Sequence, residues 1–280
     1  MTIEPPLKIN NRPDISKGKS DMSDWLHRLP VAWMAVVVFG ATYLFAAAIY
    51  ATVMSLASGE RARAFKAVSP GMLPPLGILF ALFVAFTAAQ VWNDNDRAGA
   101  AVDREASALR SVVILAAAFP GDPQTRLYAL VRRHIEEVAT REWPMMAHET
   151  ASLSIIPSHL VEALQLTLAL TPGNAGQQTA QREMVIQLES ALDARRQRIL
   201  ISRTHVRLVK WACLLVQAIC ALFAIALVHS DNRLAAFIMM GVFATGVAAC
   251  VLLIAAYDRP FLGHLAINPD PLLQVMPEAP

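Results

Sequence analysis

Four long apolar runs constrain this chain most, because each is long enough to cross a lipid bilayer as a helix. They cover residues 31–57, 73–92, 211–229 and 234–257. A helix rises about 1.5 Å per residue, so roughly 20 apolar residues cross the ~30 Å hydrocarbon core of a membrane. We therefore expect an all-α membrane protein with four transmembrane helices. They would form two transmembrane hairpins, over 31–92 and 211–257.

The stretch between the second and third runs is polar and contains no further segment long enough to span. Apolar residues recur there at helical spacing near 124–143, near 158–170 and from 176 onwards. Pro144 is expected to close the first of these helices, because proline disrupts the interior of a helix. We expect a helical domain over 93–210, inserted between the second and third spans and continuous with both.

The distribution of basic residues predicts the side of the membrane on which this domain lies. Residues 1–30 carry five Lys or Arg residues, and six more stand between 195 and 210. The two loops inside the hairpins carry only three and one. Because basic residues gather on the cytoplasmic side, we expect the helical domain to be cytoplasmic. A mobile N-terminal tail over 1–30 and a C-terminal tail over 258–280 would lie on the same side.

Composition and motifs argue against several classes of function. The mean hydropathy of +0.43, with 16% charged residues, is too apolar for an ordinary soluble enzyme. A net charge of +2 gives no reason to expect nucleic acid as a partner. The three cysteines lie in apolar stretches, and the histidines lack the spacing of a metal site. We therefore expect no enzymatic activity, no catalytic residues, no metal and no cofactor.

The second apolar run and its polar continuation share one stripe, and a carboxylate lies in the middle of it. At about 100° per residue, Phe80, Phe83, Thr87, Asp94 and Glu105 fall near one line along the helix. Two interpretations stay open. In the first, Glu105 pairs with an arginine of a neighbouring helix and fixes the packing. In the second, the stripe faces a symmetry axis, so that the first four residues line a pore and Glu105 is a charge below it.

Three segments resemble the bestrophin-like family of uncharacterised membrane proteins. They are PPLGILFALFVAFTAAQVWNDNDRAGAAVDREASALRSV from residue 74, REWP at 141–144 and YDRPFLGHLAINP at 257–269. The resemblance covers about 31–273 and implies a bacterial inner-membrane protein with four spans. The residues that carry it are Trp92, Arg97, Glu142, Trp143, Pro144, Asp258, Arg259, Pro260, Phe261 and Gly263.

A more distant resemblance connects the chain to bestrophin ion channels, which are homopentamers with a pore-lining second span. It implies a homo-oligomer in the lipid bilayer that conducts inorganic ions, with Phe80, Phe83 and Thr87 in an apolar neck. The arginine-rich stretch that follows the neck in those channels is replaced here by residues 93–97, NDNDR. The alternative function is a non-conducting membrane scaffold or regulator whose cytoplasmic helices bind a partner.

Overall fold

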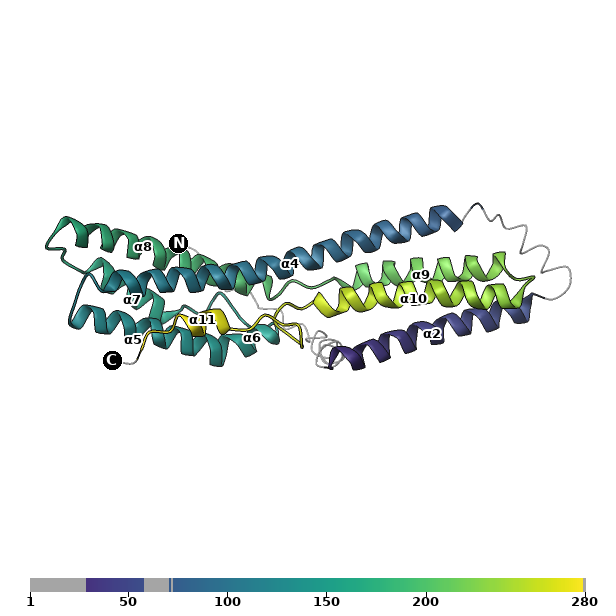
Figure 1. Ribbon diagram of the computed structural model, residues 1–280, viewed down its shortest axis with the longest axis horizontal. Helices are drawn as coiled ribbons and strands as arrows, with labels where there is room; N and C mark the ends of the chain where they lie inside the picture. The colour runs from purple at the N-terminus through teal and green to yellow at the C-terminus, as the bar shows by residue number, and fades with distance from the viewer. Residues whose placement is uncertain (1–28, 58–70, 72, 279–280) are drawn as a thin grey trace, which may run out of the picture.

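The computed structural model describes residues 29–57, 71 and 73–278, and all regular structure in these residues is helical (Figure 1). The mobile tail predicted over 1–30 lies outside the described residues except for its last two positions. The basic loop between the first two spans also lies outside them, apart from residues 57 and 71. The predicted all-helical class is confirmed for the part that the structure describes.

Four helices are long and apolar enough to cross a membrane, as predicted from the four apolar runs. They are α2 (Val31–Leu56), α4 (Leu73–Ala116), α9 (Leu208–Val228) and α10 (Arg233–Tyr257). Together they form the membrane bundle, with the apolar first half of α4 as its fourth member. The side chains of Ala244 and Ala248 in α10 are fully buried. Small side chains let membrane helices approach closely, and here they help α10 to pack against its neighbours.

Helix α4 leaves the membrane bundle without ending, which confirms the continuous helix expected from the second run. Its 44 residues correspond to about 66 Å, roughly twice the hydrocarbon thickness. Its second half packs against α8 in the polar half of the molecule (Figure 1). Helix α4 therefore runs without interruption from the membrane bundle into the polar half, where residues 93–116 lie.

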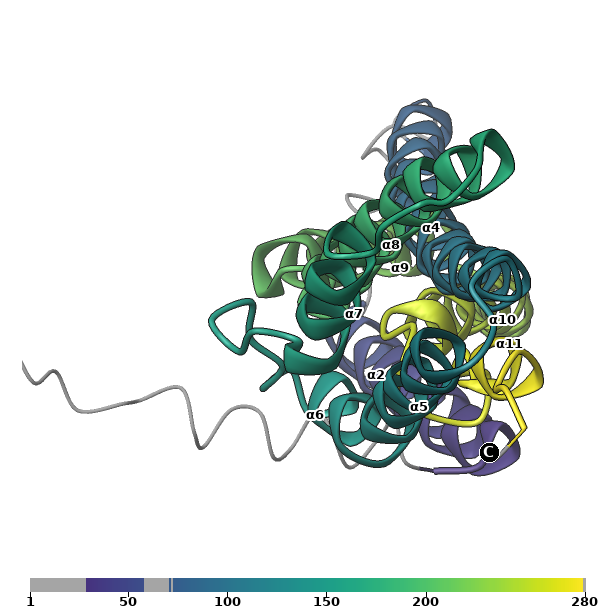
Figure 2. The ribbon, with the colours of Figure 1, turned by 90° about the vertical axis from the view of Figure 1, so that its left-hand side faces the viewer.

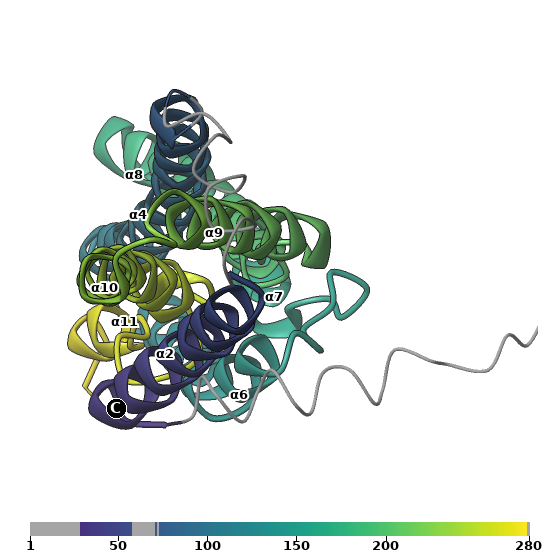
Figure 3. The same cartoon turned by 90° about the vertical axis from the view of Figure 1, so that its right-hand side faces the viewer.

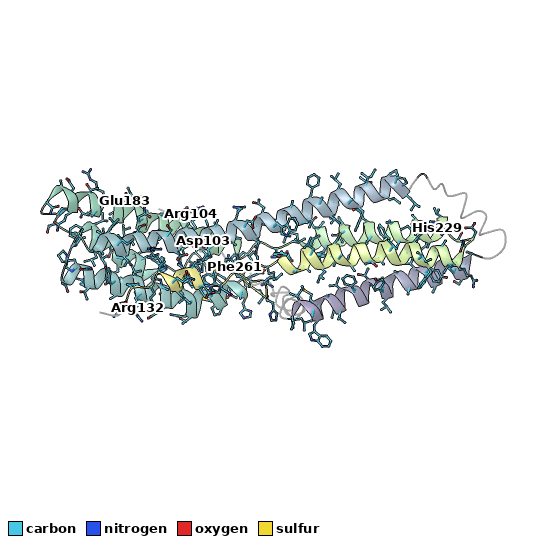
Figure 4. The ribbon with its side chains drawn as sticks, in the orientation of Figure 1. Asp103, Arg104, Arg132, Glu183, His229 and Phe261 are labelled. Atoms are coloured by element: carbon cyan, nitrogen blue, oxygen red, sulfur yellow. The ribbon has the colours of Figure 1, made fainter. Side chains whose placement is uncertain are left out.

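The second half of α4 belongs to a middle bundle, which lies end to end with the membrane bundle (Figure 1). Its other helices are α5 (Asp122–Glu137), the π-helical turn η2 (Val138–Glu142), α6 (Trp143–Ala147), α7 (Ser158–Leu168), α8 (Ala175–Ile201) and α11 (Asp270–Gln274). One apolar core joins all of these elements, including Leu109 of α4, Leu127 of α5, Leu188 of α8 and Leu272 of α11. Figure 4 shows Phe261 in this half and His229 at the far end of the membrane bundle.

The expected continuity between the domain and the third span is wrong, because residues 202–207 separate α8 from α9. Two hydroxyl groups at the end of α8 bond to backbone carbonyls: Ser202 Oγ to Ile199 O and Thr204 Oγ1 to Ile201 O. Such bonds compete with helical hydrogen bonding. Asp258 Oδ1 then accepts the Val206 N–H at 2.6 Å. Contacts with a distant segment therefore hold a break that the local sequence does not signal.

Pro144 does not close the helix before it, which corrects a second prediction. The chain passes from α5 through the π-helical turn η2 and directly into α6, where Pro144 is in the first turn. A proline is tolerated at this position because the N–H it lacks needs no helical partner there. The wider π turn lets the chain stay helical up to the proline, and it changes the direction of the side chains that follow. It places Glu142 and Trp143 on the side facing α8.

Candidate functional site

The stripe of α4 that contains Glu105 is the face packed against the protein's own helices. Phe80 is 7% exposed, Thr87 is 4% exposed and Glu105 is completely buried. The Phe80 ring lies 5.7 Å from the ring of Phe243 in α10. This stripe therefore forms a helix contact along nearly the full length of α4.

Glu105 is the centre of a buried charge cluster that joins α4, α5 and α8. Arg198 donates from Nε to Glu105 Oε2 at 2.9 Å and from Nη2 to Oε1 at 3.3 Å. His134 Nε2 lies 3.0 Å from Glu105 Oε1. A carboxylate only accepts, so the proton of this hydrogen bond is on His134 Nε2. Of the two roles considered for Glu105, the buried ion pair is the one that its contacts form.

A second carboxylate, Glu142 from the π turn, completes the buried charge cluster. Its Oε2 accepts from Arg198 Nη2 at 3.0 Å, and its Oε1 accepts from Arg195 Nε at 2.7 Å and from Arg195 Nη2. Arg195 and Arg198 are one turn apart on α8, and both are buried. Two carboxylates and two guanidinium groups balance in charge, as burial in an apolar core requires.

Trp143 connects the buried charge cluster to the C-terminal tail. The guanidinium carbon of Arg198 lies 5.1 Å from the centre of the Trp143 ring, which is a cation–π contact. The Trp143 ring also meets Phe261 edge to face, with ring centroids 5.5 Å apart. The indole Nε1 donates to Ile267 O at 3.0 Å. The tail after α10 is thereby fixed onto the middle bundle.

The electrostatic balance of the buried charge cluster favours the charged form of Glu105. Burial by itself raises the pKa of this carboxyl, but Arg198 and His134 outweigh it and lower the pKa to about 2. Glu105 lies 13 residues beyond position 92, where the apolar run ends. That is about 20 Å further along the helix, outside the membrane-spanning part of α4.

This lowered pKa predicts a loss of stability in acid. A carboxyl whose pKa is lower in the folded state stabilises the fold above its unfolded-state pKa. That contribution is then lost as the pH falls from about 4.5 to about 2. We expect the unfolding temperature of the wild type in detergent to fall more steeply over this pH range than that of Glu105→Gln. Equal slopes for the two proteins would contradict the assignment.

The other face of α4 is uncovered from one end of the helix to the other. At about 100° per residue, it lies opposite Glu105. We define the free face by the exposed residues on this side: Ile78, Leu82, Phe86, Ala89, Asn93, Asp96, Ala100, Asp103, Ser107, Arg110 and Ile114. It is apolar from 78 to 89 and polar from 93 to 110. None of the pore candidates taken from the sequence belongs to it.

Phe83 and Asp94 lie within about 40° of the line through Glu105 and are less completely covered than their neighbours on the same stripe. Phe83 is partly buried among residues of α9 and α10. Asp94 is partly buried and pairs with Arg97 at 3.7 Å. Trp92 is 49% exposed at the end of the apolar run. Such a position suits a tryptophan at a membrane interface.

The tail motif lies at the junction of the two bundles. Arg259 Nη2 donates to Ala147 O at 3.1 Å and pairs with Glu149 at 3.3 Å. Gly263 has φ +104°, a conformation that favours glycine, so the turn after Pro260 needs this residue. The motif therefore orders the turn that carries Phe261 back to Trp143.

Sequence reasoning did not identify Arg195, Arg198 or His134 as members of the site. The basic run that includes the two arginines was assigned to membrane topology. Yet they fall on the apolar edge of α8 after Met184, Leu188 and Ala191, at steps of three and four residues. Reading α8 by angle, as was done for α4, finds both. In the part of the chain that the structure describes, no group of three or more His, Cys, Asp or Glu side chains could hold a metal ion.

The fold and the site define a membrane protein whose second candidate span continues as one helix into a second helical bundle. The sequence profile of the Bestrophin-like domain matches residues 40–272, and the chain belongs to this family. A crystal structure of a membrane protein has a similar fold, with a TM-score of 0.60 and 14% sequence identity. The match covers 88% of this chain and 99% of that one. No curated protein matches the chain significantly.

Proposed function

We propose that the protein is an ion channel of the bacterial inner membrane, formed by several copies with α4 of each copy nearest the symmetry axis. Membership of the Bestrophin-like family supports this proposal, as does the distant resemblance to bestrophin channels. The observation that carries it furthest is the free face of α4. It stays exposed across both the membrane part and the middle bundle of a single chain.

The sequence of the free face suits an ion pathway. Ile78, Leu82 and Phe86 are 66%, 50% and 69% exposed and stand one turn apart. Rings of such side chains around an axis form a narrow apolar constriction, which can gate by excluding water. Asn93 and Asp96 follow directly on the same face, where the apolar part ends. These residues therefore replace Phe80, Phe83, Thr87 and Asp94 as our proposed pore lining.

The proposed orientation places the middle bundle and both chain ends in the cytoplasm. Arg195, Arg196, Arg198, Arg203, Arg207 and Lys210 precede the third span on that side. Two of them, Arg195 and Arg198, are neutralised inside the buried charge cluster. The other four still outnumber Arg233, the single Lys or Arg residue at the turn from α9 into α10, so the positive-inside rule keeps its direction. In this scheme the buried charge cluster is a structural support for α4.

Particle images of the purified protein, together with ion flux into liposomes, test this proposal. We expect a ring of subunits with α4 at the centre and an ion flux above that of protein-free liposomes. A monomer in mild detergent would contradict the proposal. A ring that carries no flux would favour the alternative, a non-conducting membrane scaffold.

A further inference from the structure

The segment between α6 and α7 carries a patch of exposed apolar side chains in the middle bundle. Leu153, Ile155 and Ile156 are 41%, 47% and 72% exposed. Single apolar side chains are common on protein surfaces, but neighbouring ones that form a patch mark interaction sites. We call residues 153–156 the apolar loop tip.

Hydrogen bonds from two arginine side chains fix the backbone of the apolar loop tip and of the residues just before it. Arg203 Nε donates to Ala151 O at 2.9 Å, and Arg195 Nη2 donates to Ile155 O at 3.2 Å. Arg195 is only 5% exposed, and its guanidinium is also bound to Glu142 of the buried charge cluster. The tip is therefore ordered before any partner arrives, which lowers the entropy cost of binding.

The direction of the apolar loop tip indicates where its partner lies. Figures 2 and 3 look along the long axis from opposite ends, and in both the segment between α6 and α7 projects sideways from the body. The four spans run along this long axis (Figure 1), so a sideways projection runs parallel to the membrane plane. A surface aimed in that direction faces the space beside the subunit, where a neighbouring copy would lie, and does not point along the spans into the bilayer.

The opposite side of the chain offers a matching surface. α11 and the tail around it lie across the body from the apolar loop tip, with the membrane part of α4 on a third side (Figures 2 and 3). In this tail Leu265 is 44% exposed and Leu273 is 42% exposed. A closed ring needs two unlike, complementary surfaces on the two flanks of each copy. The loop tip and the tail meet this requirement.

We infer that the apolar loop tip of one copy docks on the tail of the next copy, over Leu265 and Leu273. This inference rests on the proposed function, because it needs a ring with α4 nearest the axis. The contact ties the subunit interface to the buried charge cluster through Arg195. It also gives the tail a second role besides its attachment to Trp143.

Photocrosslinking of the full chain in detergent tests the contact directly. With a benzoylphenylalanine in place of Ile156, we expect a crosslinked dimer whose linked peptide lies within residues 258–278 of a second copy. The control carries the same group in place of Leu168. That residue is 61% exposed at the other end of α7 and should give no crosslink. In parallel, Ile156→Asp should raise the concentration at which the oligomer dissociates by about tenfold, or about 1.4 kcal/mol, whereas Leu168→Asp should not change it.

The possible results separate this inference from the proposed function. An oligomer that crosslinks elsewhere, or that is unchanged by Ile156→Asp, overturns the inference and leaves the channel proposal standing. A wild-type monomer overturns both. Quenching of an Ile156→Trp fluorophore by brominated lipid tails would place the tip in the bilayer and would also overturn the inference.

Discussion

Arg198→Met is expected to lower the free energy of unfolding by about 3–5 kcal/mol, the usual cost of removing one partner of a buried ion pair. Methionine replaces the apolar stem of the arginine but not its guanidinium, so the loss comes mainly from the missing charge and its hydrogen bonds. Glu105 would remain fully buried, with only His134 as a hydrogen-bond partner. Glu142 would keep Arg195 alone. Denaturant titration in detergent, followed by the helical circular dichroism signal, measures the change.

Arg196→Met is the matched control, because Arg196 is exposed on the same helix two residues away. Substitutions at such surface positions usually change stability by about 0.5 kcal/mol or less. The double variant Glu105→Gln with Arg198→Met should cost less than the sum of the two single variants, since neither change then leaves a charge unpaired. Equal costs for the Arg198 and Arg196 variants would show that the buried charge cluster contributes little.

Truncating apolar side chains on the free face of α4 is expected to have the largest effect on ion flux. We expect Leu82→Ala combined with Phe86→Ala to raise the flux into liposomes about tenfold or more. Smaller side chains widen an apolar constriction and make it easier to wet. A tenfold change in rate needs a barrier change of only about 1.4 kcal/mol. A flux assay with a potential-sensitive dye measures the effect.

The control for this prediction is Phe80→Ala, on the packed face of the same helix. Phe80 is 7% exposed and contacts Phe243. Its removal should lower stability by about 3–5 kcal/mol, as for other buried phenylalanines, without opening the pathway. If Phe80→Ala raised the flux and the free-face variant did not, the pore would be lined by the stripe first taken from the sequence.

The comparison of these two faces shows why the sequence could single out α4 but not which of its faces stays exposed. In the membrane part of α4, residues on both faces are apolar, because lipid tails and neighbouring helices favour the same side chains. Phe80 and Phe86 are therefore equivalent in composition. Only the positions of α9 and α10 decide that Phe80 is packed and Phe86 is free. In the polar half of α4 the contrast between the two faces was visible in the sequence, and pairing of Glu105 with an arginine was one of the two interpretations left open.

The ends of the helices also show which features local sequence could predict and which it could not. The helix expected from about 158 and the span expected to end at 257 agree with α7 and α10, which begin at Ser158 and end at Tyr257. The break at 202–207 did not, because it depends on Asp258 and Ala151, about 50 residues away on either side. Local sequence also did not predict that the helical segment continues past Pro144, which the π turn before it allows.

The sequence by itself determined the four spans, the all-helical class and the unbroken helix from the bilayer into the middle bundle. These follow from local hydrophobicity, helical periodicity and the absence of proline, which act over a few turns. Only the tertiary structure decided the partner of Glu105, because Arg198 lies 93 residues away. It also decided which face of α4 stays free, since that depends on where α5, α8, α9, α10 and α11 pack.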